Sequence, residues 1–174
     1  MHAWLHDRLF NALLGEPLVG NAFRGTLVEA IVAEALASEW HWCADGWGSF
    51  DFVNADGLGL EVKQSAARQD WHDQDAKPCV CRFDIASRTG RWDGALWVAE
   101  PGRSAALYVF AHHPVFNPAL ADHRDPEQWE FYVVPATELP AQRSLGLNGI
   151  RSLASAVSFG GLAEAVATAK AGLP

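Results

Sequence analysis

The stretch FDFVNADGLGLEVKQS, residues 50–65, is the most informative part of this sequence. Two apolar segments with strand-like composition, at roughly 47–54 and 58–64, are separated by the turn sequence NADGL. Such a pattern is typical of a β-hairpin, and Gly57 suits the left-handed position of a three-residue loop. We therefore predict a hairpin in this stretch.

The register of this hairpin decides which charged side chains meet. With a three-residue loop, Asn54 faces Leu58, and counting back places Asp51 opposite Glu61. Lys63 follows Glu61 by two residues and points to the same face. A two-residue loop would instead pair Asp51 with the residue after Glu61 and separate these charges. We favour the three-residue loop.

Two opposed carboxylates repel each other and are costly to bury, so a compensating charge is expected near Asp51 and Glu61. A divalent cation suits this place, because Mg²⁺ prefers one or two carboxylates, retained waters and phosphate oxygens. The backbone carbonyl of Val62 would lie near the same ion. Lys63 can orient an attacking water or stabilise charge that builds on phosphorus. Together these groups match the needs of metal-assisted phosphodiester hydrolysis.

Each of these residues also has a simpler interpretation. Glu61 and Lys63 would form a solvent-facing row if the sheet were exposed on that side. Thr26 to Glu29 fits a capping box, in which the glutamate returns to the first amides of a helix. Both alternatives remain open at the level of the sequence.

The wider pattern predicts an α/β fold. Residues 26–38 form the clearest helix, and a short helix near 4–14 precedes it. Further strands are predicted at 79–86, 95–100, 105–113 and 128–136, followed by helices near 145–156 and 160–171. This order favours a central mixed β-sheet flanked by helices, in a single domain over residues 1–174.

The spacing of Asp51 and the run 61–63 (EVK) resembles the D…(D/E)xK signature of the PD-(D/E)XK nuclease superfamily, which has the restriction-endonuclease-like fold. The RG pair at 24–25 followed by Glu29 is similar to the opening seen in archaeal Holliday-junction resolvases. Phe50 stands where the superfamily often has proline. The resemblance implies a helix, hairpin strands, a second helix and a strand, with the core at about 20–113. Residues 114–174 would add a C-terminal strand and a helical extension.

The resemblance implies roles for five residues. Asp51 and Glu61 would bind Mg²⁺ or Mn²⁺, and Lys63 would be a catalytic cation. Glu29 would be an auxiliary acid near the metal or its water, and Gln64 would contact the substrate or a metal-bound water.

Two arginines are candidate substrate-binding residues. Arg24 belongs to the resolvase-like RG pair, and Arg68 lies in the segment 65–77, close to Trp71. Arginines with interleaved aromatic residues suit single-stranded or distorted nucleic acid. We therefore expect Arg68 to contact DNA, and the resemblance implies substrate binding by Arg24.

The composition restricts the class of protein. With 174 residues, 49% apolar and 20% charged, the chain matches one globular domain. A net charge of −8 speaks against a protein that coats nucleic acid. No apolar run reaches the length of a membrane span, and the amino terminus is a poor signal peptide. Three cysteines without framework spacing (Cys43, Cys79 and Cys81) indicate reduced thiols and a cytoplasmic location.

The sequence thus predicts a Mg²⁺-dependent nuclease that cuts DNA by attack of a metal-activated water. A different class remains possible, in which the same fold is catalytically idle and serves nucleic-acid binding or protein assembly. A small-molecule phosphohydrolase would suit the acidity but has no motif of its own here. A homodimer is compatible with the nuclease prediction, because cleavage of paired strands often uses two copies of one site.

Overall fold

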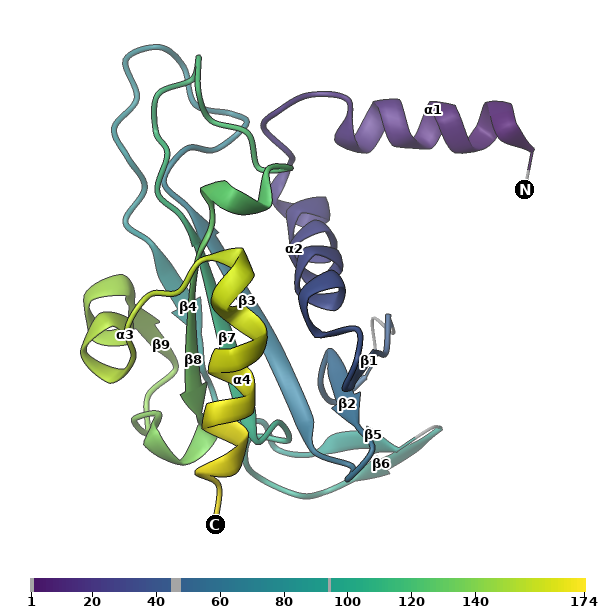
Figure 1. Ribbon diagram of the computed structural model, residues 1–174, viewed down its shortest axis with the longest axis vertical. Coiled ribbons are helices and arrows are strands. Elements are labelled where there is room, and N and C mark those ends of the chain that lie inside the picture. Colours follow the sequence, from purple (N-terminus) through teal and green to yellow (C-terminus); the bar gives the residue numbers. More distant parts are fainter. Residues whose placement is uncertain (1, 45–47, 94) are drawn as a thin grey trace.

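The computed structural model describes residues 2–44, 48–93 and 95–174. Its centre is a mixed sheet of five strands (Figure 1), in the order β1 (Trp40–Trp42), β2 (Phe52–Asn54), β3 (Gly59–Ala66), β7 (Leu107–His113) and β8 (Glu130–Pro135). β3 and β7 are parallel, and the other neighbouring strands are antiparallel. The prediction of an α/β chain with a central mixed sheet is confirmed.

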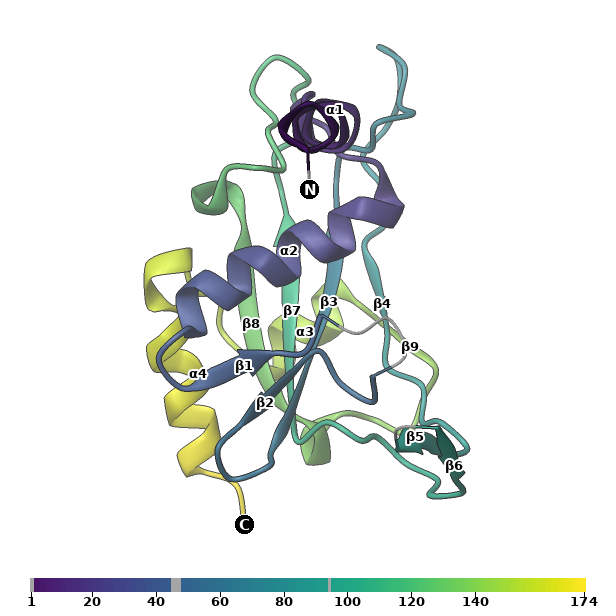
Figure 2. The same cartoon turned by 90° about the vertical axis from the view of Figure 1, so that its right-hand side faces the viewer.

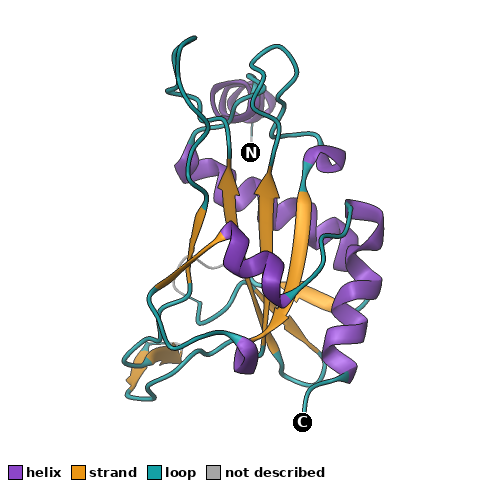
Figure 3. Ribbon diagram, turned by 90° about the vertical axis from the view of Figure 1, so that its left-hand side faces the viewer, coloured by secondary structure: helices purple, strands orange, loops and turns teal. Residues whose placement is uncertain are grey.

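Helices cover both faces of the sheet. α2 (Asn21–Leu36) and α4 (Leu162–Ala171) pack on one face, and α3 (Leu147–Leu153) lies over the other (Figures 2 and 3). α1 (Ala3–Leu14) extends away from the sheet and has no buried residue (Figure 1). Within the described part of the chain, no helix has the length and apolar character needed to cross a bilayer.

The connection between β3 and β7 differs from what the resemblance implies. Its described residues hold three short strands and no helix: β4 (Arg82–Asp84), β5 (Arg91–Asp93) and β6 (Leu96–Val98). β5 and β6 form a hairpin of their own, and β4 pairs with β9 (Ser144–Gly146). The second core helix expected from the superfamily pattern is therefore wrong for this segment, and α3 occupies that face of the sheet instead.

The C-terminal segment belongs to the core. β8 pairs with β7 along its length, and Leu162 and Val166 of α4 are buried against α2 and the sheet. The strand predicted at 47–54 is shorter than expected: β2 holds only residues 52–54, while 45–47 lie outside the described residues.

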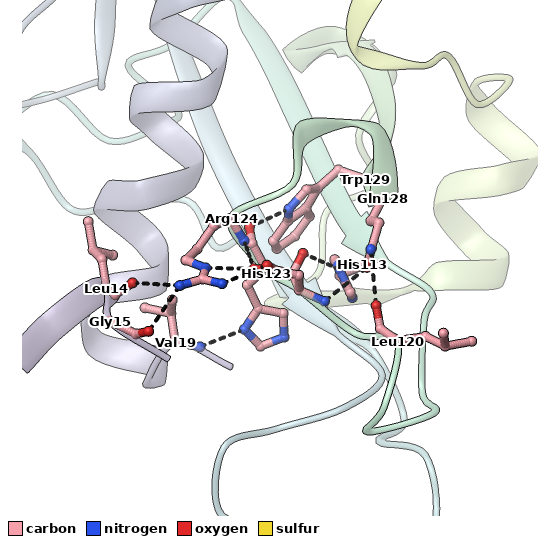
Figure 4. Close-up of polar contacts among 10 residues, drawn as sticks. Leu14, Gly15, Val19, His113, Leu120, His123, Arg124, Gln128 and Trp129 are labelled. Atoms are coloured by element: carbon pink, nitrogen blue, oxygen red, sulfur yellow. Dashed lines mark hydrogen bonds and ion pairs between the residues drawn. The ribbon is translucent and has the colours of Figure 1, made fainter. Parts of the chain in front are cut away.

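The loop 114–129 holds the junction between α1 and α2 in place (Figure 4). Arg124 Nη1 donates a hydrogen bond of 3.0 Å to the carbonyl of Leu14 at the end of α1. The backbone amide of Val19 donates to Nδ1 of the buried His123, also at 3.0 Å. Segments more than 100 residues apart in the sequence are thereby joined at the start of α2.

Candidate active site

The β2–β3 hairpin has the predicted register. Phe52 faces Leu60 and Val53 faces Gly59, which is the pairing of the three-residue loop. Gly57 has a φ of +79°, the left-handed conformation that glycine adopts without strain. The prediction of the register is confirmed, and the two-residue alternative is excluded.

Asp51 lies one residue before β2, at the end of the paired ladder. Its amide donates to the carbonyl of Leu60 at 3.0 Å, and its carboxylate Oδ2 accepts a hydrogen bond of 2.7 Å from the amide of Val62. The amide and carbonyl of one strand residue point to the same edge. The carbonyl of Val62 therefore also points toward Asp51, as the sequence predicts.

Phe50 helps to place Asp51. A Cβ atom at Gly59 would lie 2.4 Å from Cδ1 of Phe50, so the ring of Phe50 packs directly on the backbone of β3. Only glycine leaves room for this contact. The packing holds the chain immediately before Asp51 against β3, at the position where the superfamily often has proline.

Glu61 and Lys63 lie on one face of β3, and the Lys63 ammonium donates to Oε1 of Glu61 as an ion pair. The alternate residues Leu60 and Val62 point the other way and are buried in the core under α2. Glu61 and Lys63 are each only partly exposed. They are thus not the solvent-facing row of the simpler interpretation.

Glu29 faces the same region from α2. The helix begins at Asn21 with Gly20 as its N-cap, so Thr26 and Glu29 lie well inside it, and the capping-box interpretation is wrong. Oε2 of Glu29 instead accepts a hydrogen bond of 3.1 Å from the indole nitrogen of Trp42 on β1.

A cavity of about 500 Å³ joins these acids, and we call it the Asp51 cavity. It is lined by residues of α2, β1, β3 and the loops around β2 and the β5–β6 hairpin: Thr26, Glu29, Trp42, Ala44, Gly48, Ser49, Asp51, Glu61, Arg88, Gly90, Arg91, Trp92, Trp97 and Ser104. Lys63 lines a neighbouring hollow that also contains Arg24 and Gln64. The three predicted acids thus share one cavity, and the predicted catalytic lysine lies at its border.

Two of the acids that line the Asp51 cavity have raised pKa values. Burial, and next the charge of Glu61, raise the pKa of Asp51 to about 7, although the Val62 amide acts in the opposite direction. Burial also raises the pKa of Glu29, against the hydrogen bond from Trp42. Burial and neighbouring carboxylates thus favour the protonated forms of both acids.

Gln64 and the buried Arg24 form a polar cluster at the start of α2. Arg24 is 1% exposed, and its Nε donates to Oε1 of Gln64 at 2.7 Å. Its Nη2 donates to Oδ1 of Asn21 at 2.8 Å, and that oxygen also accepts from Gln64 Nε2. Gln64 points to the α2 side of β3, away from the face of Glu61 and Lys63. Arg24 therefore positions α2 on β3, and substrate contact by either residue stays a prediction.

Arg68 is buried as well. Its Nη2 donates to the carbonyls of His72 and Asp73 at 3.0 and 2.9 Å, and its guanidinium lies 5.2 Å from the ring centre of Phe116. These contacts tie the segment after β3 to the loop after β7. The predicted contact of Arg68 with DNA remains a prediction.

The site offers few protein ligands for Mg²⁺. No group of three or more His, Cys, Asp or Glu side chains is arranged to hold a metal ion in the described ranges. Two carboxylates, from Asp51 and Glu61, together with the Val62 carbonyl, are nevertheless a sufficient protein contribution for Mg²⁺, which keeps several waters. The raised pKa of Asp51 is what a carboxylate lacking its cation would have. The residues therefore fit a divalent cation.

The β5–β6 hairpin is the part of this site that sequence reasoning missed. It brings Arg88, Arg91, Trp92 and Trp97 to the Asp51 cavity. Its strands have three residues each, too few for a periodic pattern. The Asp93-Gly94 pair between two Trp-containing segments is a hairpin signal that would have indicated it.

Comparison of the chain with protein-family models, with curated proteins and with solved structures finds no match.

Proposed function

We propose that this protein is a Mg²⁺-dependent nuclease of the restriction-endonuclease-like class, which hydrolyses DNA phosphodiester bonds. The order α2, β1, β2 and β3, with β7 parallel to β3, supports this class. The observation that carries the proposal is the convergence of Asp51, Glu61 and the Val62 backbone at one edge of β3. Neighbouring Lys63 adds the cation of the D…ExK pattern.

Each residue has a defined task in this proposal. Asp51 and Glu61 hold the ion, which when bound lowers the pKa of a water and offsets phosphate charge. Lys63 stabilises negative charge on the phosphoryl group and orients the attacking water. Glu29, whose Oε2 accepts from Trp42, would accept a hydrogen bond from the attacking water. Gln64, through Arg24, keeps β3 aligned with the start of α2.

One observation favours the idle-fold alternative. Lys63 already pairs with Glu61, and this contact partly compensates the carboxylate without any metal ion. With a net charge of −8, the chain also has little general attraction for DNA. Under this alternative the protein would bind a nucleic acid or a protein partner without cutting it.

Cleavage and metal binding separate these possibilities. The purified chain is incubated with plasmid and oligonucleotide DNA in Mg²⁺, Mn²⁺ or EDTA, beside the variants Glu61→Gln and Glu34→Gln. Glu34 lies on the exposed side of α2 and is the matched control. We expect metal-dependent cleavage that Glu61→Gln abolishes and Glu34→Gln keeps. Absence of cleavage, together with calorimetric metal binding that Glu61→Gln leaves unchanged, would overturn the proposal.

A further inference from the structure

The β5–β6 hairpin places two exposed tryptophans in the wall of the Asp51 cavity. Trp92 and Trp97 are directly paired across the hairpin, so their side chains lie on one face. Their ring centres are 5.4 Å apart with an interplanar angle of 69°. They are 44% and 49% exposed, and both line the same cavity as Asp51 and Glu61. Clustered exposed aromatic surface of this kind marks a binding surface.

The hairpin is fixed relative to the acids. Oγ of Ser49, two residues before Asp51, donates to the carbonyl of Trp92 at 3.1 Å. A Cβ atom at Gly90 would lie 2.7 Å from Cζ2 of Trp97, so this indole rests directly against the backbone at Gly90. The two indoles are therefore held in place beside the site. Figure 2 shows the hairpin as a projection separate from the central sheet.

Two arginines add positive charge to the same wall. Arg88 and Arg91 line the Asp51 cavity, and their guanidiniums pair with Asp84 at 2.7 Å and Glu100 at 2.9 Å. Arg88, Asp84 and Glu100 are exposed, and ion pairs of this kind stabilise a fold little. A phosphate group can therefore exchange with these carboxylates as the partner of either arginine.

We infer that the β5–β6 hairpin stacks an unpaired nucleobase on the face of one of its two indoles, Trp92 or Trp97, with the other indole against the edge of the base, so that DNA with a single-stranded segment is the substrate of the proposed nuclease. This inference rests on the proposed function. Stacking on exposed indoles is sequence-tolerant, because every base has a π-face. A base within a duplex has both faces covered by its neighbours and cannot use such a platform. A cavity of about 500 Å³ has room for one nucleoside.

Binding in EDTA tests the inference without cleavage. A fluorescein-labelled 12-nucleotide single strand and the matching blunt duplex are titrated with the wild-type protein and the variants Trp97→Ala, Trp92→Ala and Trp97→Phe. Trp4→Ala is the control, since Trp4 is 62% exposed on α1 and outside the Asp51 cavity. We expect the single strand to bind at least 10-fold more tightly than the duplex. Each alanine variant should lose about 5- to 100-fold for the single strand, while Trp97→Phe keeps most of the affinity.

The outcomes separate this inference from the proposed function. Single-strand binding that depends on the two tryptophans, without cleavage in Mg²⁺ and with metal binding that Glu61→Gln leaves unchanged, supports the base platform and overturns the nuclease. Metal-dependent cleavage of single strand and duplex at equal rates, unchanged in the alanine variants, supports the nuclease and overturns the platform. Equal affinity for both DNA forms, or an equal loss in Trp4→Ala, also overturns it. If Trp97→Ala does not fold, Trp92→Ala and Trp97→Phe still decide the question.

Discussion

The carboxylate of Asp51 accepts a hydrogen bond of 2.7 Å from the backbone amide of Val62, beyond the last paired residues of the β2–β3 hairpin. The bond fixes one carboxylate oxygen on the edge of β3. Because the Val62 carbonyl points to the same edge, a cation bound there would meet a carboxylate and a backbone oxygen from two strands. The contact therefore links the geometry of the hairpin to the chemistry of the site.

We predict that Asp51→Asn stabilises the metal-free protein at high pH. The pKa of Asp51 is raised to about 7 from 3.8, so the folded state binds more protons than the unfolded state between these values. The contribution of Asp51 to stability is therefore lost as pH rises through this window. At pH 8 the neutral amide, which can still accept from Val62, should add about 4 kcal/mol to the free energy of unfolding.

Urea unfolding of both proteins at pH 4.5 and pH 8 measures this effect. The gain should fall to about 1 kcal/mol at pH 4.5, where Asp51 of the folded wild type is protonated but that of the unfolded chain is mostly ionised. Asp75→Asn at an exposed position should change the free energy of unfolding at neither pH. Saturating Mg²⁺ at pH 8 should stabilise the wild type alone. A variant that is less stable than the wild type at pH 8 would contradict the electrostatic account.

Lys63→Ala should separate catalysis from metal binding. Removal of a group that stabilises transition-state charge costs about 10²–10³ in rate, so we expect a loss of that size in Mg²⁺-dependent cleavage. Lys63 also occupies Oε1 of Glu61 as an ion-pair partner, so its removal should leave Mg²⁺ affinity unchanged or raised. Single-turnover cleavage and calorimetry measure the two effects, with Lys77→Ala at an exposed position as the control. Parallel loss of rate and metal affinity would show that Lys63 only supports the site.

The hairpin and its charges could be predicted because the rules that determine them are local. Gly57 is suited to the left-handed position of the turn. Once that position is assigned, counting along both strands shows that Asp51 faces Glu61 across the hairpin. The parallel pairing of β3 with β7 involves distant segments, and only the continuous apolar run of β7 indicated that it is buried on both faces.

Other features could not be predicted, since tertiary contacts decide them. The beginning of α2 depends on Arg24, which is buried against Gln64 of β3 and extends the helix to Asn21. That extension removes Glu29 from the capping position that its local sequence favours. In the same way, β1 has only three residues and exists through its pairing with β2.

We predict that Arg24→Ala destabilises the fold. Arg24 is 1% exposed, and its loss would leave Oε1 of Gln64 without its donor, remove one of the two donors to Oδ1 of Asn21 and open a cavity under α2. The lost packing of the buried guanidinium stem and the lost hydrogen bonds should together cost about 2–4 kcal/mol. Chemical denaturation measures this cost, and Arg143→Ala at an exposed position is the control.

The same variant tests whether Arg24 contacts DNA. At a temperature where Arg24→Ala remains folded, a purely structural arginine should leave the affinity for single-stranded DNA in EDTA within about twofold of the wild type. A loss near tenfold, which is about 1.4 kcal/mol, would assign it a direct role in binding.

Protonation of His123 should make the protein sensitive to acid. Burial lowers its pKa to about 4, and the charges of His113 and Arg24 act in the same direction. Its Nδ1 accepts from the Val19 amide, while Nε2 lies 3.2 Å from the Arg68 carbonyl, so the neutral ring with a proton on Nε2 satisfies both contacts. Between pH 6.5 and 4 the unfolded state binds more protons than the folded state. The free energy of unfolding should therefore decrease as the pH is lowered through this window, by about 2–3 kcal/mol.

The difference between wild type and His123→Asn isolates the contribution of this one side chain. Asparagine can still accept from Val19 through Oδ1 but does not titrate, so the variant should have a lower free energy of unfolding at pH 7 and a flatter decline toward pH 4. Urea unfolding between pH 4 and 7 measures both slopes, with His41→Asn at an exposed position as the control. Because burial also lowers the pKa values of His112 and His113, part of the decline should remain in His123→Asn. Parallel curves for wild type and His123→Asn would mean that His123 does not contribute to the acid sensitivity.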